Sequence, residues 1–175
     1  MILAVAAAVV ICVVAAFSAL DYYQYQTYIK PFEDTYMGYA TDIIQAGAVE
    51  SNALIAGACT PEVSEYIESS LSMFVNDSLT GYSLVGSGFT EIQGTKFVHL
   101  QLVQNGTPIS LFVGCSKHVI MPGFEEELAI GDGYFSHMCD YCQMMYWKDG
   151  TTMIVAVCEN KTMNLSELRP VVQPL

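Results

Sequence analysis

Apolar residues fill the first twenty positions of the chain almost without interruption. Met1 to Leu20 contain no charged residue, and Ser18 is the one ordinary polar side chain among them. At about 1.5 Å per helical residue, this segment spans about 30 Å, the thickness of the hydrocarbon core of a bilayer. We therefore expect a transmembrane helix over 1–20. The alternative is a cleavable signal peptide, but such a peptide begins with a positively charged region and has a shorter apolar stretch.

Tyrosines and a helical pattern follow this apolar segment. Tyrosine rings are amphipathic and prefer the headgroup layer of a membrane, so the sequence predicts an interfacial belt made of Tyr22, Tyr23, Tyr25 and Tyr28. Apolar residues then recur at helical spacing among polar ones. We expect 21–58 to form an interfacial and helical stalk.

The clearest helix signal beyond the first twenty residues begins at Thr60. Thr60 is a suitable N-cap, Pro61 suits the first helical position, and Glu62 places a negative charge in the first turn. Apolar residues then repeat on one face, at Val63, Tyr66, Ile67, Leu71 and Phe74. This pattern predicts a helix that packs its apolar face against a core.

The period of the pattern becomes two from Gly81 onward, which predicts strands. The expected strands are 82–85, 89–92, 96–104 and 109–113, followed by a second hairpin of 143–148 and 151–158. The pairs Asn105-Gly106 and Asp149-Gly150 supply tight turns, and a short helix over 165–169 should stop at Pro170. The fold class is therefore α+β: behind the transmembrane helix, residues 59–175 should form a small antiparallel β-meander covered by one or two helices.

Alternation along 96–104 assigns side chains to the two faces of the sheet. Val98, Leu100 and Leu102 share one face, which we expect to be buried. His99 and Gln101 share the other. We expect His99 to lie at the surface or at the edge of the core.

Short motifs follow one another in a particular order along this domain. After Glu62 come Gly81-Tyr82-Ser83-Leu84-Val85-Gly86, then Gly94, then Ser110-Leu111-Phe112-Val113, and finally Met145-Tyr146-Trp147-Lys148-Asp149-Gly150 before a valine-rich strand and Leu165. This order resembles the extracytoplasmic domain of single-pass transmembrane anti-sigma factors. The resemblance implies an outward-facing, sensor-like or protein-contacting domain on a membrane tether. The cytoplasmic zinc-binding His-x3-Cys-x2-Cys pattern of that family is absent from this sequence, so sigma-factor inhibition is not expected.

The charge balance narrows the classes of partner. The chain has 6 basic and 18 acidic residues, a net charge of −12. Phosphate binding needs clustered Lys and Arg, so nucleic acid is not an expected partner. Anionic lipid headgroups also repel an acidic face. We expect the membrane itself and a protein partner or membrane complex.

Cysteines and histidines form the one group of residues with obvious chemistry. Its members are Cys115, His118, His137, Cys139, Cys142 and Cys158. The spacing of Cys139 and Cys142 places two thiolates within reach of one ion, and sulfur and imidazole ligands suit Zn or Cu. Cys115 and His118 would complete such a site only if the fold brings the two loops together. A structural disulfide between Cys139 and Cys142, or free thiols, are the alternatives, and Cys158 is expected to be buried or bridged.

Aromatic residues near the second hairpin offer a possible docking patch. Trp147, the sole tryptophan, is expected in the core because a small sheet needs a large anchor. Alternatively, Trp147 with Phe135 and Tyr141 could present an interface, where such residues are over-represented.

The sequence contains no recognised catalytic motif. It has no Gly-x-Ser-x-Gly elbow, phosphate-binding glycine loop or His-Glu-x-x-His pair, so we do not expect an enzyme. Five cysteines beyond the first twenty residues favour an oxidising compartment. The expectation is a single-pass protein of the cell membrane whose extracytoplasmic domain, on the periplasmic side, binds another protein as an accessory subunit. The alternative is a metal-binding or thiol-redox protein that uses the Cys139 and Cys142 loop.

Overall fold

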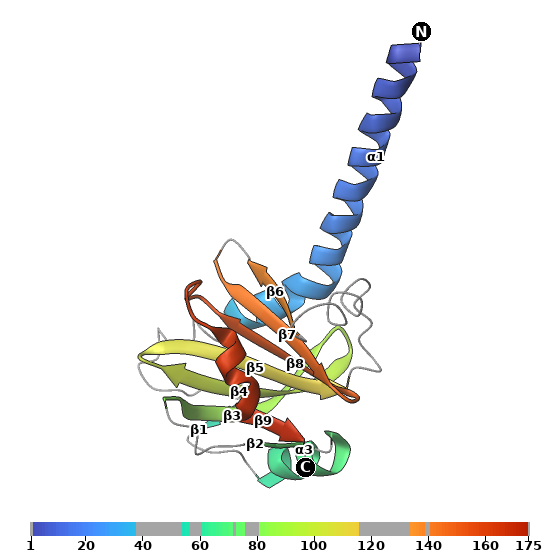
Figure 1. Cartoon of the computed structure of the whole chain (residues 1–175). Helices are drawn as coiled ribbons and strands as arrows, with labels where there is room; N and C mark the ends of the chain where they lie inside the picture. The colour runs from blue at the N-terminus through green and yellow to red at the C-terminus, as the bar shows by residue number, and fades with distance from the viewer. Residues whose placement is uncertain are drawn as a thin grey trace.

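A long N-terminal helix projects from a β-sheet domain in the computed structural model (Figure 1). The structure describes residues 2–37, 54–56, 61–71, 73–75, 81–115, 134–138 and 141–174, with side-chain burial described from Val10 onward. Helix α1 covers Ile2–Gln24 and continues through the π-helical turn η1, Tyr25–Ile29, into helical residues 30–37. Considering only the described residues, no helix has both the length and the apolar character needed to cross a membrane.

Seven antiparallel strands form the main sheet, in the order β1-β3-β4-β5-β8-β7-β6. Their bounds are β1 Leu54–Ala56, β3 Ser83–Ile92, β4 Thr95–Gln104, β5 Thr107–Cys115, β6 Tyr134–Met138, β7 Gln143–Asp149 and β8 Thr152–Cys158. Two further strands, β2 (Met73–Val75) and β9 (Val172–Pro174), pair with each other. The expected α+β class with an antiparallel sheet is confirmed.

Tight turns connect neighbouring strands as the sequence predicted. Asn105 and Gly106 have φ of 51° and 79°, and they join β4 to β5. Gly150, with φ of 55°, begins the turn between β7 and β8. This turn is one residue later than predicted, because Asp149 still pairs with Thr152 and the turn consists of 150–151. Gln93 and Gly94 make an equivalent turn between β3 and β4, which was not predicted.

Helical and extended segments cover one face of the sheet. The helix α3 (Pro61–Leu71), the 3₁₀ helix η3 (Leu165–Val171), β2 and β9 pack there against the predicted apolar face of β4. Their buried side chains include Val63, Ile67, Leu71, Leu165, Leu168, Val171 and Val172. This confirms α3 as a helix that buries one apolar stripe.

The opposite face is covered by the helical path that continues α1. Ile29, Phe32 and Tyr36 recur at a spacing of three to four residues, so they lie on one side of the helix and pack on the sheet. Their partners include Phe97 on β4 and Phe112 on β5. The sheet is therefore buried on both faces.

Several boundaries differ from the sequence-based expectations. The stalk assigned to 21–58 is wrong in part, because residues 25–37 cover the sheet and Leu54–Ala56 form its edge strand β1. The domain consequently does not begin at residue 59. The two strands expected over 82–85 and 89–92 are one strand, β3, with a bulge after Leu84.

Two helix ends also differ from expectation. Helix α3 ends at Leu71, so Phe74 belongs to β2 rather than to the helical stripe. The last helix does not stop at Pro170, which lies inside the 3₁₀ helix η3 one residue before its end at Val171. The proposed cap Thr60 is outside the described residues.

Candidate functional site

Helix α1 exposes apolar side chains to the surroundings. Every residue from Val10 to Tyr23 is exposed. The large ones are Val10, Ile11, Val13, Val14, Phe17, Leu20, Tyr22 and Tyr23, between 48% and 68% exposed. Between Val10 and Leu20, alanines, Cys12 and Ser18 occupy the remaining positions, so that part of the helix has no charged face.

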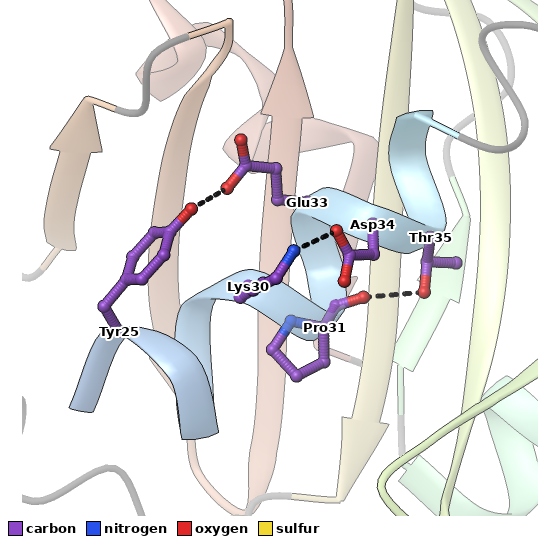
Figure 2. A network of polar contacts seen from close by, with 6 residues as sticks. All are labelled: Tyr25, Lys30, Pro31, Glu33, Asp34 and Thr35. Carbon is purple, nitrogen blue, oxygen red and sulfur yellow. Dashed lines mark hydrogen bonds and ion pairs between the residues drawn. The ribbon is translucent and has the colours of Figure 1, made fainter. Parts of the chain in front are cut away.

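A network of polar contacts holds the bend where α1 meets the domain, as Figure 2 shows. The Tyr25 hydroxyl donates to Oε2 of Glu33 at 2.7 Å, which links η1 to the next helical turn. Lys30 Nζ lies 2.7 Å from Oδ1 of Asp34, and this hydrogen bond raises the pKa of Lys30. The Thr35 hydroxyl donates to the carbonyl of Pro31, also at 2.7 Å.

Aromatic contacts fix helical residues 25–37, called the helical cover below, on the sheet. The Phe32 ring meets the rings of Phe97 and Phe112 edge to face, with centroids 5.3 and 5.5 Å away. The buried Tyr36 hydroxyl accepts a hydrogen bond from the backbone N–H of Glu159 at 3.0 Å and donates to the carbonyl of Pro108 at 3.5 Å. Burial raises the pKa of Tyr36, which keeps its hydroxyl protonated.

His137 brings strand β6 against the base of α1. Its ring centroid lies 6.0 Å from that of Tyr25. Burial lowers the pKa of His137, and the nearby Glu33 carboxylate opposes that shift. Glu33 is itself 7% exposed, so its carboxylate is enclosed between the cover and β6 rather than directed to solvent.

Cys142 is buried immediately before β7 and is disulfide-bonded. Its partner is not among the other described cysteines, because Cys12, Cys115 and Cys158 are free. Cys139 is outside the described residues, so a pairing of Cys139 with Cys142 stays a prediction. In the bonded state the sulfur of Cys142 carries no thiolate with which to bind a metal.

The fold separates the remaining candidate metal ligands. Cys115 pairs with Thr152 at one end of the sheet, whereas Cys158 pairs with Gln143 at the other, about 20 Å away along the strand. Cys115 and Cys142 therefore cannot share one ion, so the condition for a combined site is not met by these two cysteines. No group of three His, Cys, Asp or Glu suited to a metal occurs among the described residues, which do not include His118.

Cys158 lies on the sheet face opposite to that of Cys142. It is buried and free, it packs in the core beneath α3 and η3, and burial raises the pKa of its thiol. Its sulfur accepts a hydrogen bond from the N–H of Asn160 at 3.2 Å. Burial, one of the two expectations for Cys158, is confirmed.

Trp147 is a core residue. It is 2% exposed and packs in the same core as Met145, while Tyr146 faces the other side of the sheet. The expected core role is confirmed, and the alternative of a docking role for Trp147 is wrong because its ring is covered on the folded domain. Tyr141 is 69% exposed, and the side chain of Phe135 is outside the described residues.

The four tyrosines of the expected interfacial belt divide into two pairs. Tyr22 and Tyr23 are 67% and 61% exposed on the last turns of α1. Tyr25 and Tyr28 instead pack partly against the domain core. Only the first pair is therefore fully exposed.

A buried polar pair on β4 and β5 was not predicted. His99 is fully buried, so its expected place at the surface or core edge is wrong. Its Nε2 lies 2.8 Å from the Ser110 hydroxyl, and its ring stacks on Phe112 at 4.7 Å. Alternation had placed His99 on the correct face, but it could not show that residues 25–37 cover the same side of the sheet.

Comparisons with known proteins identify no relative. No protein-family model, curated protein or solved structure matches the chain. The resemblance to transmembrane anti-sigma factors therefore stays a prediction.

Proposed function

We propose that this chain is a single-pass membrane protein whose acidic extracytoplasmic domain binds another protein as an accessory subunit of a membrane complex. The exposed apolar surface of α1 is the observation that carries the proposal. A helix that is apolar on all sides is stable when it is enclosed by protein or lipid, not by water. The sequence supports the same proposal, because its uncharged stretch 2–20 would measure about 29 Å at about 1.5 Å per helical residue.

The disulfide at Cys142 supports a location outside the cytoplasm. Disulfides persist in oxidising compartments and are rare where thiols are kept reduced. The net charge of −12 favours a protein partner over nucleic acid or an anionic lipid surface. The resemblance of the motif order to tethered anti-sigma domains supports the same class of role.

The continuous helical path from α1 into the helical cover indicates that the domain is held at a defined angle to its anchor. The helical path runs from α1 into the cover of the sheet with no loop between them. Phe32 and Tyr36 fix that cover by ring contacts and by hydrogen bonds to β5 and to the residue after β8. A contact made by the domain would therefore act on α1 through packed side chains.

The anchor is tested by extraction of membranes with alkaline carbonate. The full chain should stay in the membrane pellet, and a chain that begins at Asp21 should be released. A matched pair of variants of unchanged helix length tests whether membrane retention depends on the apolar character of α1. The double variant Ile11→Arg, Val14→Arg should lose membrane retention because two charges enter the bilayer centre, whereas Ile11→Leu, Val14→Leu should keep it. Release of the unmodified full chain by carbonate would refute the anchor.

The protein partner is tested by crosslinking in intact membranes followed by native electrophoresis. We expect the full chain to migrate with a heterologous protein in stoichiometric amount. The chain that begins at Asp21 should lose this association if the complex forms in the membrane plane and keep it if the domain suffices. Migration of the full chain only as a monomer would refute the accessory-subunit role.

A further inference from the structure

Exposed large apolar side chains are concentrated in two places among the described residues. One place is α1, and the other is the turn between β6 and β7. Met138 ends β6 and is 56% exposed, and Tyr141 lies two residues before β7 and is 69% exposed. The rest of the described domain buries its large apolar residues wholly or in part. The exposure of these two side chains therefore requires an explanation specific to this turn.

This turn lies on the side of the domain from which α1 emerges. The contact between His137 and Tyr25 places the last residues of β6 next to the base of the helix. In Figure 1, β6 points toward the α1 side, whereas α3 and the C-terminus lie at the opposite end. Tyr22 and Tyr23, the exposed tyrosines of α1, lie in its last turn, shortly before the Tyr25 that contacts His137.

Charged side chains at this junction are paired with neighbouring groups. The buried Glu33 accepts the Tyr25 hydroxyl, and Lys30 is paired with Asp34. The described residues of this junction include no cluster of basic side chains, the feature that attracts anionic headgroups. Exposed tyrosine and methionine instead suit the boundary between headgroups and acyl chains of uncharged lipid.

We propose that the side chains of Met138 and Tyr141, beside the paired ends of β6 and β7, insert into the headgroup layer of the membrane in which α1 is anchored. The domain then has two lipid contacts, the helix with Tyr22 and Tyr23, and the turn beside it. The second contact restricts the tilt of the sheet relative to the bilayer plane, which a single helix does not fix. This proposal rests on the proposed membrane anchor.

The test uses the full chain in vesicles of phosphatidylcholine brominated close to the headgroup. A Tyr141→Trp variant places a quenchable indole at the turn, and Glu68→Trp places one on the exposed side of α3 as the matched control. The native Trp147 is buried in both proteins and contributes the same background. We expect brominated lipid to reduce the emission gained by Tyr141→Trp and to leave the emission of Glu68→Trp as it is in unbrominated vesicles.

Flotation of the vesicles in a density gradient separates the two proposals. Protein that floats with the vesicles while Tyr141→Trp escapes quenching would overturn the lipid contact alone, and would leave the turn to a protein partner. Equal quenching of Tyr141→Trp and Glu68→Trp would overturn it as well, because the contact would not be specific to the turn. Protein that does not float would overturn both the anchor and the contact that rests on it.

Discussion

At the scale of single residues, polar side chains buried between the helical cover and the sheet affect the stability of the domain and its dependence on pH. Tyr36 is 1% exposed, and its hydroxyl joins the cover to the backbone of Pro108 and Glu159. Buried hydrogen-bonding groups contribute modestly when paired and cost more when a partner is removed. Tyr36 therefore links three segments that are distant in the sequence.

Tyr36→Phe should lower the free energy of unfolding by about 1–2 kcal/mol, because the Glu159 N–H and the Pro108 carbonyl lose their common partner. Urea unfolding in mild detergent, followed by the fluorescence of the buried Trp147, measures this change. Tyr141→Phe is the matched control, since Tyr141 is exposed and should tolerate loss of its hydroxyl. Equal stability of both variants would contradict the linking role of Tyr36.

His99 should make stability depend on pH. Burial lowers the pKa of His99 to about 3 from an ordinary value of 6.5. Between these values the unfolded chain holds a proton that the folded chain does not, so stability falls as the pH falls below 6.5. Above pH 6.5 both states are neutral and this contribution is constant.

The difference in unfolding free energy between the unmodified protein and His99→Gln isolates this contribution, since glutamine does not titrate. That difference should change by about 2 kcal/mol between pH 7 and pH 5, with the unmodified protein losing the larger amount. Urea unfolding at the two pH values measures it. Parallel losses in both proteins would show that His99 is accessible to protons in the folded state.

At the scale of elements, tight turns fix the register of the meander. Gly106 has φ of 79°, and a Cβ built there would meet nothing within 4 Å. A side chain at this position therefore costs energy through the backbone alone. Gly114 differs, because its Cβ would lie 2.6 Å from the ring of Phe97.

Gly106→Ala should lower the free energy of unfolding by about 1 kcal/mol, because alanine disfavours positive φ. Gly106→Asn is the matched variant and should cost less, since asparagine adopts this conformation more readily. Thermal melting of the unmodified protein and the two variants gives the order of their stabilities. If alanine were tolerated as well as glycine, the assigned turn would be wrong.

The elements that the sequence predicted are those with long local patterns. Strand β4 was predictable because alternation over 96–104 ends at an Asn-Gly turn. The strands β1, β2 and β9 have three residues each, which is too short for a period to show. The helical spacing of Ile29, Phe32 and Tyr36 was visible, but the sheet that it covers is formed by residues far along the chain.

The candidate site was predictable only in part for the same reason. The exposed tyrosines Tyr22 and Tyr23 follow directly from their place after the apolar segment. The separation of Cys115 from Cys142 depends on strand register, which residue spacing does not reveal. The burial of Glu33 was not predictable, because an acidic residue on a helix is usually exposed, whereas here it is 7% exposed and accepts a hydrogen bond from Tyr25.

At the scale of the whole molecule, the helical path over 25–37 belongs both to the anchor and to the domain. On one side it continues α1, and on the other it buries a face of the sheet that includes Phe97, Phe112 and Tyr146. Deleting the anchor alone therefore differs from deleting the anchor together with the helical cover. Comparing the two truncated chains tests at which residue the folding unit begins.

A chain that begins at Asp21 should fold, since it keeps every described side chain that packs on the sheet. A chain that begins at Gly38 should lose native packing, because Phe32, Tyr36 and Ile29 no longer exclude water from the apolar face, and each buried side chain of this size contributes about 1.5–3 kcal/mol. Near-ultraviolet circular dichroism and binding of a hydrophobic dye measure the difference. Native spectra from the shorter chain would mean that the sheet is stable without its cover, and that the bend at η1 serves only to direct α1.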